Sequence, residues 1–156
     1  MATILVAVIA AVAALVGYLV TGAINRRTER SQRYAQALDA VERYKQLPNV
    51  FRRLHDGTAE TRVELANKLT DAQIAIAYHR RLLTLDSVEL GDAYGVLVEK
   101  IRSKNSEFRL NALSQQPVDL DSGIEVGKAY EFDEREELLH CLQVMRKRSS
   151  ILRNLF

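Results

Sequence analysis

Hydrophobic residues are distributed along this chain in two different ways. From Ala2 to Ile24 there is no charged side chain, and most residues are Ala, Val, Ile or Leu. From Asn25 onward, hydrophobic residues recur at helical spacing among many charged ones. The pattern predicts an all-α protein. A single N-terminal transmembrane helix over residues 2–24 is followed by a helical soluble domain, a three- or four-helix bundle, over residues 25–156.

The apolar stretch is long enough to cross a bilayer. A helix rises about 1.5 Å per residue, so the stretch covers roughly 33 Å, close to the thickness of the hydrocarbon core. A cleaved signal peptide is the alternative, with Gly22 or Ala23 as a cleavage position. Two features disfavour it: no basic residue precedes the stretch, and the stretch exceeds the usual apolar core of about 7–15 residues.

Basic residues give the expected orientation. Arg26, Arg27, Arg30 and Arg33 lie directly after the apolar stretch, and no charged side chain precedes it. By the positive-inside rule, we expect a single-pass protein of the cell membrane with its N-terminus outside and its C-terminal domain in the cytoplasm.

Small residues recur every four positions within the predicted span, at Ala13, Gly17 and Thr21. Such a face lets two membrane helices approach closely. These residues are therefore candidates for helix–helix contact within the membrane, although Ala and Gly are also common in any such segment.

The soluble part contains four periodic segments. The first runs from Asn25 to about Gln46, has a spacing typical of coiled coils, and is expected to stop at Pro48. The second begins after the capping residue Thr58 and ends near Leu85. It carries two apolar rows, both expected to face the core. The first row is Leu65, Leu69, Ala72, Ile76, His79 and Leu83, and the second is Ile74, Tyr78, Leu82 and Leu85.

A capping-box spacing over Asp86–Glu89 predicts a tight joint to the next helix. That helix carries Gly91 and Gly95, which suit close packing on a neighbour. A loop is expected between Ser114 and Gly123, and a last helix from Glu131 to about Asn154. The expected apolar faces of these two helices are Leu90, Tyr94, Leu97, Ile101 and Phe108, and Leu138, Leu142, Met145, Leu152 and Phe156.

Composition limits the possible functions. A net charge of +2 gives no global basic field, so nucleic acid is not an expected partner. The single cysteine, Cys141, excludes an internal disulfide, and three scattered histidines form no metal signature. No cofactor is expected. Arginine greatly outnumbers lysine, which fits a GC-rich bacterial or phage gene.

Few residues suggest catalysis. The dipeptide His55-Asp56 occurs in metal-dependent phosphohydrolases, but before Gly57 it is more typical of a turn. One alternative function is a small enzyme or ligand-binding module with a polar site inside the bundle. Its candidate residues lie on the apolar rows of two consecutive helices: Tyr78, His79, Tyr94 and Lys104.

Basic residues also precede the apolar C-terminal residues. Together with Arg26 and Arg27, the cluster Arg146, Lys147 and Arg148 is a candidate for contact with the membrane surface. The competing interpretation is that the segment 146–156 closes the bundle core. The sequence thus favours a non-enzymatic, membrane-anchored protein that acts at the cytoplasmic membrane face. Its expected partners are membrane lipid and either another protein or a second copy of itself.

Overall fold

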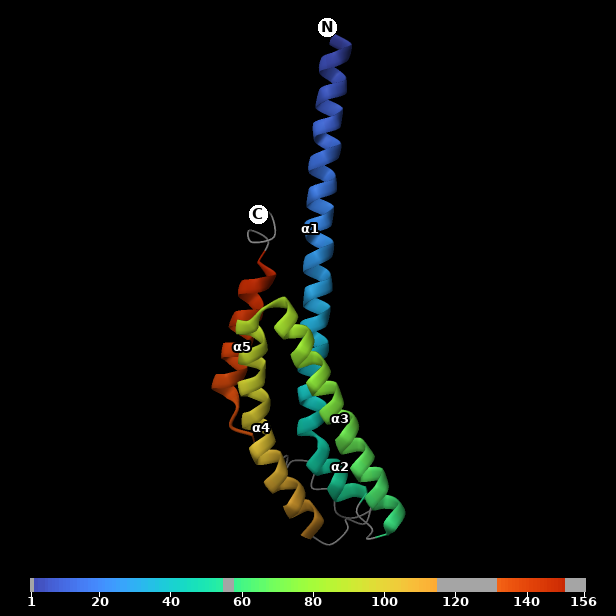
Figure 1. The fold of residues 1–156 in the computed structure, drawn as a ribbon, viewed down its shortest axis with the longest axis vertical. Coiled ribbons are helices and arrows are strands. Elements are labelled where there is room, and N and C mark those ends of the chain that lie inside the picture. Colours follow the sequence, from blue (N-terminus) through green and yellow to red (C-terminus); the bar gives the residue numbers. More distant parts are fainter. Residues whose placement is uncertain (1, 55–57, 115–131, 151–156) are drawn as a thin grey trace.

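The computed structural model is a helical bundle from which one long helix projects (Figure 1). It describes the backbone of residues 2–54, 58–114 and 132–150, and the side chains of residues 14–52, 58–112 and 132–150. Within these ranges every regular element is a helix, which confirms the all-α prediction. The helices are α1 (Ala2–Lys45), α2 (Leu47–Leu54), α3 (Ala59–Asp86), α4 (Val88–Ser114) and α5 (Arg135–Ser149).

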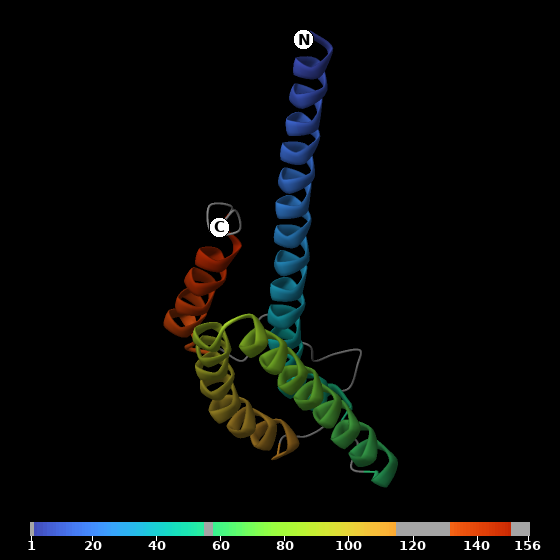
Figure 2. The same ribbon diagram turned by 45° about the horizontal axis from the view of Figure 1, so that its top comes forward.

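Helix α1 has two different surroundings. Figures 1 and 2 agree that its N-terminal half extends well beyond the other helices, whereas its C-terminal half packs among them. α3 and α4 form a helical hairpin, and α5 lies against α4 with its C-terminal end directed toward the projecting half of α1 (Figure 2).

The core forms where α4 meets the other helices. Leu90, Tyr94, Leu97 and Ile101 of α4 are fully buried, as the row predicted. Their partners are the C-terminal half of α1 (Tyr34, Ala37, Val41 and Tyr44), the first row of α3 (Leu65, Ile76 and Leu83) and one face of α5 (Cys141, Val144 and Met145). Burial of these side chains is the main source of the bundle's stability.

The second apolar row of α3 does not face the core, contrary to expectation. Ile74 is 62% exposed, Tyr78 57% and Leu85 84%, and Leu82 is half-buried. The physical reason is that α1, α2 and α4 pack on the other side of α3, along its first row. A helix this rich in apolar residues offers two possible stripes, and packing used only one.

Pro48 does not end the first soluble helix in the way expected. α1 stops at Lys45, and Pro48 then lies in the first turn of α2, where its missing N–H costs nothing. α2 is an eight-residue helix that the sequence pattern did not predict, and its Leu47 and Phe51 side chains are buried in the core.

The predicted cap at Thr58 and the tight joint after α3 are observed, but the capping box over Asp86–Glu89 is not: Asp86 is the last residue of α3, and its carboxylate pairs with Tyr34 and Arg30. The Thr58 side chain accepts a hydrogen bond from the backbone N–H of Thr61, as an N-cap does. Ser87 alone separates α3 from α4: its N–H donates to the Leu83 carbonyl, and its own carbonyl accepts from Leu90 and Gly91.

α5 starts at Arg135, later than the expected Glu131. Leu138 and Met145 pack on the core as expected, but Leu142 is exposed, and Cys141 and Val144 take the buried positions. His55, Asp56, the loop residues 115–123, Leu152 and Phe156 lie outside the described residues.

In the part of the chain with described side chains, which begins at Ala14, no helix is long and apolar enough to cross a membrane. The span over residues 2–24 therefore stays a prediction.

Two glycines of α4 lie close to α3, but they meet different groups. A Cβ built on Gly91 would lie 2.9 Å from the backbone Cα of Thr84, which cannot move without shifting α3. A Cβ on Gly95 would meet only the guanidinium end of Arg80, 2.8 Å away and flexible. Close approach of the two helices thus requires glycine at position 91 but not at position 95.

We expect Gly91→Ala to lower the free energy of unfolding by about 1–3 kcal/mol, the usual cost of overpacking. Gly95→Ala is the matched control. It should be neutral or stabilising, because alanine is about 1 kcal/mol better than glycine within a helix. Denaturant unfolding of the full chain in mild detergent, followed by circular dichroism, measures both. Equal effects at the two positions would contradict this account of the hairpin.

Candidate functional site

Polar side chains from three parts of the chain meet at the end of the bundle from which α1 projects. We call this group the junction. It consists of Arg30 and Tyr34 from α1, Asp86, Ser87 and Glu89 at the α3–α4 joint, and Lys147 and Arg148 at the end of α5.

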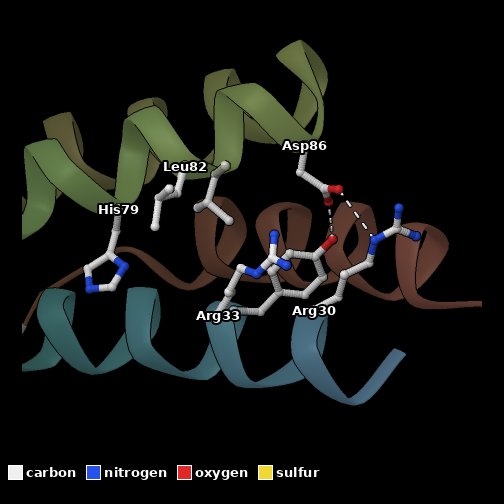
Figure 3. A pocket seen from close by; sticks show the side chains of 7 residues that line it. Arg30, Arg33, His79, Leu82 and Asp86 are labelled. Carbon is white, nitrogen blue, oxygen red and sulfur yellow. Dashed lines mark hydrogen bonds and ion pairs between the residues drawn. The ribbon is translucent and has the colours of Figure 1, made fainter. Parts of the chain in front are cut away.

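Asp86 is the central acceptor of the junction. Its carboxylate accepts a 2.5 Å hydrogen bond from the Tyr34 hydroxyl and lies 3.3 Å from Nε of Arg30 (Figure 3). The Asp86 side chain is only 13% exposed, so these contacts are largely shielded from water. Burial and the hydrogen bond to Asp86 raise the pKa of Tyr34 well above its usual value, which keeps the hydroxyl protonated and donating.

The last turn of α5 completes the junction. Nη2 of Arg148 donates to the Ser87 hydroxyl at 2.6 Å, and Nζ of Lys147 lies 3.3 Å from the Glu89 carboxylate. Nη1 of Arg30 donates to the Arg148 backbone carbonyl at 3.4 Å. Because the last carbonyls of a helix have no partner within it, a cation there is favourable.

A shallow depression lies beside the junction, between α1 and α3. It has no interior space large enough for a water molecule, and Figure 3 shows the side chains around it. Arg30 forms an ion pair with Asp86, and Nη2 of Arg33 lies 3.6 Å from the Glu29 carboxylate. The residues that line it are Arg30, Arg33, Tyr34, His79, Leu82, Leu83 and Asp86.

The chemistry available in this depression is limited. Burial lowers the pKa of His79, and the charge of Asp39 offsets this only in part, so the imidazole is neutral near pH 7. No group of three His, Cys, Asp or Glu residues that could hold a metal ion occurs in the described ranges. The junction holds helices together and places cations near one end of the bundle.

The four residues proposed for a polar core site are not brought together. Tyr94 is fully buried and donates its hydroxyl to the Ala37 carbonyl at 3.0 Å. Lys104 is exposed, lies ten residues further along α4, and pairs with Glu107 at 3.3 Å. Ten helical residues span about 15 Å. Tyr78 is exposed, and its ring makes an edge contact with half-buried His79 at 5.2 Å between centroids.

The residues proposed for membrane contact have different surroundings. Arg26 and Arg27 are exposed on α1, and Arg146 and Lys147 are exposed on α5, whereas Arg148 is half-buried in the junction. On the small-residue face, a Cβ on Gly17 would meet nothing within 4 Å, and the Thr21 hydroxyl donates to the Gly17 carbonyl at 2.9 Å. The side chain of Ala13 lies outside the described residues.

Sequence patterns did not indicate the contacts that attach α5 to α1. Besides the junction, Nζ of Lys45 lies 2.5 Å from the Glu134 carboxylate, just before α5 begins. Burial alone lowers the pKa of Lys45, but the hydrogen bond to Glu134 and the charges of Glu42 and Glu134 outweigh it, so the pKa is raised. The Lys45–Glu134 pair and the contacts of the junction join residues far apart in the chain. Helical spacing gives no information about such contacts.

Comparison of the chain with protein families, with curated proteins and with solved structures finds no match to any of them.

We expect Asp86→Asn to lower the free energy of unfolding by about 1–3 kcal/mol, because the change removes the shielded negative charge that pairs with Arg30 and accepts the hydrogen bond from Tyr34. Asp39→Asn is the matched control: its pair with Arg43 is exposed on both sides and should cost less than about 0.5 kcal/mol. Denaturant unfolding at two salt concentrations compares them. If both variants lose the same stability, Asp86 is not the anchor of the junction.

Proposed function

We propose that this protein is a single-pass membrane-anchored helical bundle, which binds a protein partner at the cytoplasmic face of the membrane. The observation that carries the proposal is the projecting half of α1, an apolar segment that extends beyond the other described helices (Figures 1 and 2).

The described part of that projecting helix carries no charged side chain on any side. At about 100° per residue, its large exposed apolar side chains cover roughly two-thirds of the circumference, and Gly17 and Thr21 lie in the remaining sector. A helix that is apolar on all sides is stable only when it is buried, in a protein core or in lipid. These exposed residues are Leu15, Val16, Tyr18, Leu19, Val20 and Ile24.

Lipid is the occupant we propose for this surface. Ala14–Ile24 alone is only about half of the roughly 20 residues that a span needs. The sequence continues without charge back to Ala2, and the backbone over these residues belongs to the same helix. The orientation with the bundle in the cytoplasm rests on the arginines from Arg26 onward.

The partner-binding surface that we propose is the outer stripe of α3. Val63, Ile74, Tyr78 and Leu85 are all more than half exposed and lie within about 60° of one another around the helix. An apolar stripe that a bundle leaves uncovered is a surface on which an amphipathic helix of another protein can pack. A small enzyme or ligand-binding module receives less support, because its four candidate residues lie apart.

We expect the double change Leu15→Asp and Leu19→Asp to remove the protein from membranes that resist carbonate washing. Each carboxylate at the centre of a span costs about 2.5–3.5 kcal/mol. The matched control is Leu110→Asp and Leu139→Asp, the same chemical change at exposed positions of the bundle.

The control protein should stay in the carbonate-resistant fraction with the wild type. A wild-type protein that carbonate releases would refute the anchor. Reporters fused after Phe156, one active only in the cytoplasm and one only outside, test the orientation separately.

We expect the double change Ile74→Glu and Leu85→Glu to abolish capture of the partner while leaving thermal unfolding unchanged, because both side chains are exposed. Val96→Glu with Leu110→Glu removes exposed apolar groups from α4 instead and should leave capture intact. Crosslinking in native membranes followed by mass spectrometry gives the readout. A partner that is a second copy appears as a dimer, and equal loss in both variants contradicts the assignment to α3.

A further inference from the structure

Cations from opposite ends of the chain gather at one end of the bundle. α1 supplies arginines just after the apolar stretch, and the last turn of α5 supplies Arg146, Lys147 and Arg148. The hydrogen bond from Arg30 to the Arg148 carbonyl brings the two groups together, although the residues are 118 positions apart. Both views show the end of α5 directed toward the projecting half of α1 (Figures 1 and 2).

Not all of these cations are equally available to a ligand. Within the junction, Arg30 pairs with Asp86 and Arg148 donates a hydrogen bond to the Ser87 hydroxyl. Among the described side chains, Arg26, Arg27 and Arg146 form no ion pair and are exposed. Within the described ranges, Arg33 pairs with the exposed carboxylate of Glu29 and Lys147 with that of Glu89, and such pairs are weak and exchange readily with other anions. We call Arg26, Arg27, Arg33, Arg146 and Lys147 the basic collar.

The basic collar lies at the depth expected of lipid headgroups, if the span ends at Ile24. The headgroup layer adds about 5–8 Å on each side of a hydrocarbon core of about 30 Å. Arg26 and Arg27 fall inside this layer. Arg30 lies about 9 Å along the helix from Ile24, and its contact with the Arg148 carbonyl places the end of α5 at the same level. That level is within about one Debye length, 8 Å, of the headgroup layer.

We propose that the basic collar binds anionic phospholipid headgroups, and that α5 thereby forms a second attachment of the bundle to the membrane. This rests on the proposed anchoring by α1 and names the lipid class that the anchored domain prefers. With attachment at both α1 and α5, the bundle cannot tilt freely relative to the plane of the membrane. The outer stripe of α3 is therefore held at a fixed angle to the membrane.

Lipid selectivity tests the proposal on the full chain reconstituted into phosphatidylcholine bilayers. Trace amounts of spin-labelled phosphatidylglycerol or phosphatidylcholine report, by electron paramagnetic resonance, how strongly each lipid associates with the protein. A cation about 4 Å from a single phosphate charge in water strengthens its association by about fivefold. We expect phosphatidylglycerol to be preferred several-fold at about 0.01 M salt, and the preference to vanish at about 1 M, where the screening length is about 3 Å.

Variants separate the two helices. The double change Arg146→Gln and Lys147→Gln should lower the preference for phosphatidylglycerol at least twofold. Arg146→Gln alone breaks no contact within the described residues, and it should also lower this preference. Arg26→Gln with Arg27→Gln tests α1. The matched control, Arg102→Gln with Lys104→Gln, removes two exposed charges from the far part of α4 and should change nothing.

Each outcome has one meaning. A wild-type preference that the α5 variants leave unchanged overturns the role of α5, and a preference that the control reduces equally overturns the basic collar. If neither labelled lipid is restricted by the protein, the chain is not inserted, and the proposed anchoring itself fails.

Discussion

The continuity of α1 is the constraint on which the rest of the molecule depends. One helix without a break runs from Ala2 to Lys45, so the same element that projects into its surroundings also forms a wall of the core. A continuous helix is stiff over this length, and the direction of its free half is set by the packing of its other half. The bundle therefore cannot reorient without moving the projecting segment with it.

Small and aromatic residues fix the packing of the core half of α1. Fully buried Ala37 leaves its backbone carbonyl accessible, and the hydroxyl of Tyr94 donates to it. Further along α4, the side-chain amide of Asn105 donates to the Tyr44 carbonyl at 2.6 Å. Both are buried polar contacts between α1 and α4, and they specify the register of the two helices more sharply than apolar packing alone. Cys141 lies in the same core, where burial raises the pKa of its thiol to about 11 and makes it unreactive near neutral pH.

Charged pairs at the two ends of α5 hold that helix in place. At its start, Lys45 pairs with Glu134 and also lies over the ring of Phe132, 5.5 Å from the centroid. At its end, Arg148 meets Ser87 in the junction. These polar contacts are partly shielded from water, so they are stronger than the exposed pairs along the helix surfaces. The position of the basic collar follows from this attachment, because without it the cations of α5 would have no fixed relation to those of α1.

The sequence by itself determined the helical class, the approximate positions of α3 and α4, and the principal core rows of these two helices. Spacing of three and four residues reports directly which side chains share a face, and Leu65, Ile76, Leu97 and Ile101 are buried accordingly. It also determined the cap at Thr58, since a cap depends on residues a few positions away. The apolar character of residues 2–24 is likewise a property of the sequence alone.

Only the tertiary structure decided between faces and partners. α3 carries two apolar stripes, and either of them could have faced the core. The positions of the neighbouring helices determined that Ile74 and Leu85 remain exposed. Periodicity also could not show that Tyr94 is buried and Lys104 exposed, because burial depends on which helices lie alongside. Two ion pairs join distant segments of the chain, Asp86–Arg30 and Lys45–Glu134. Local patterns show which residues share a face of one helix, but they do not show which charges of other helices pack against that face.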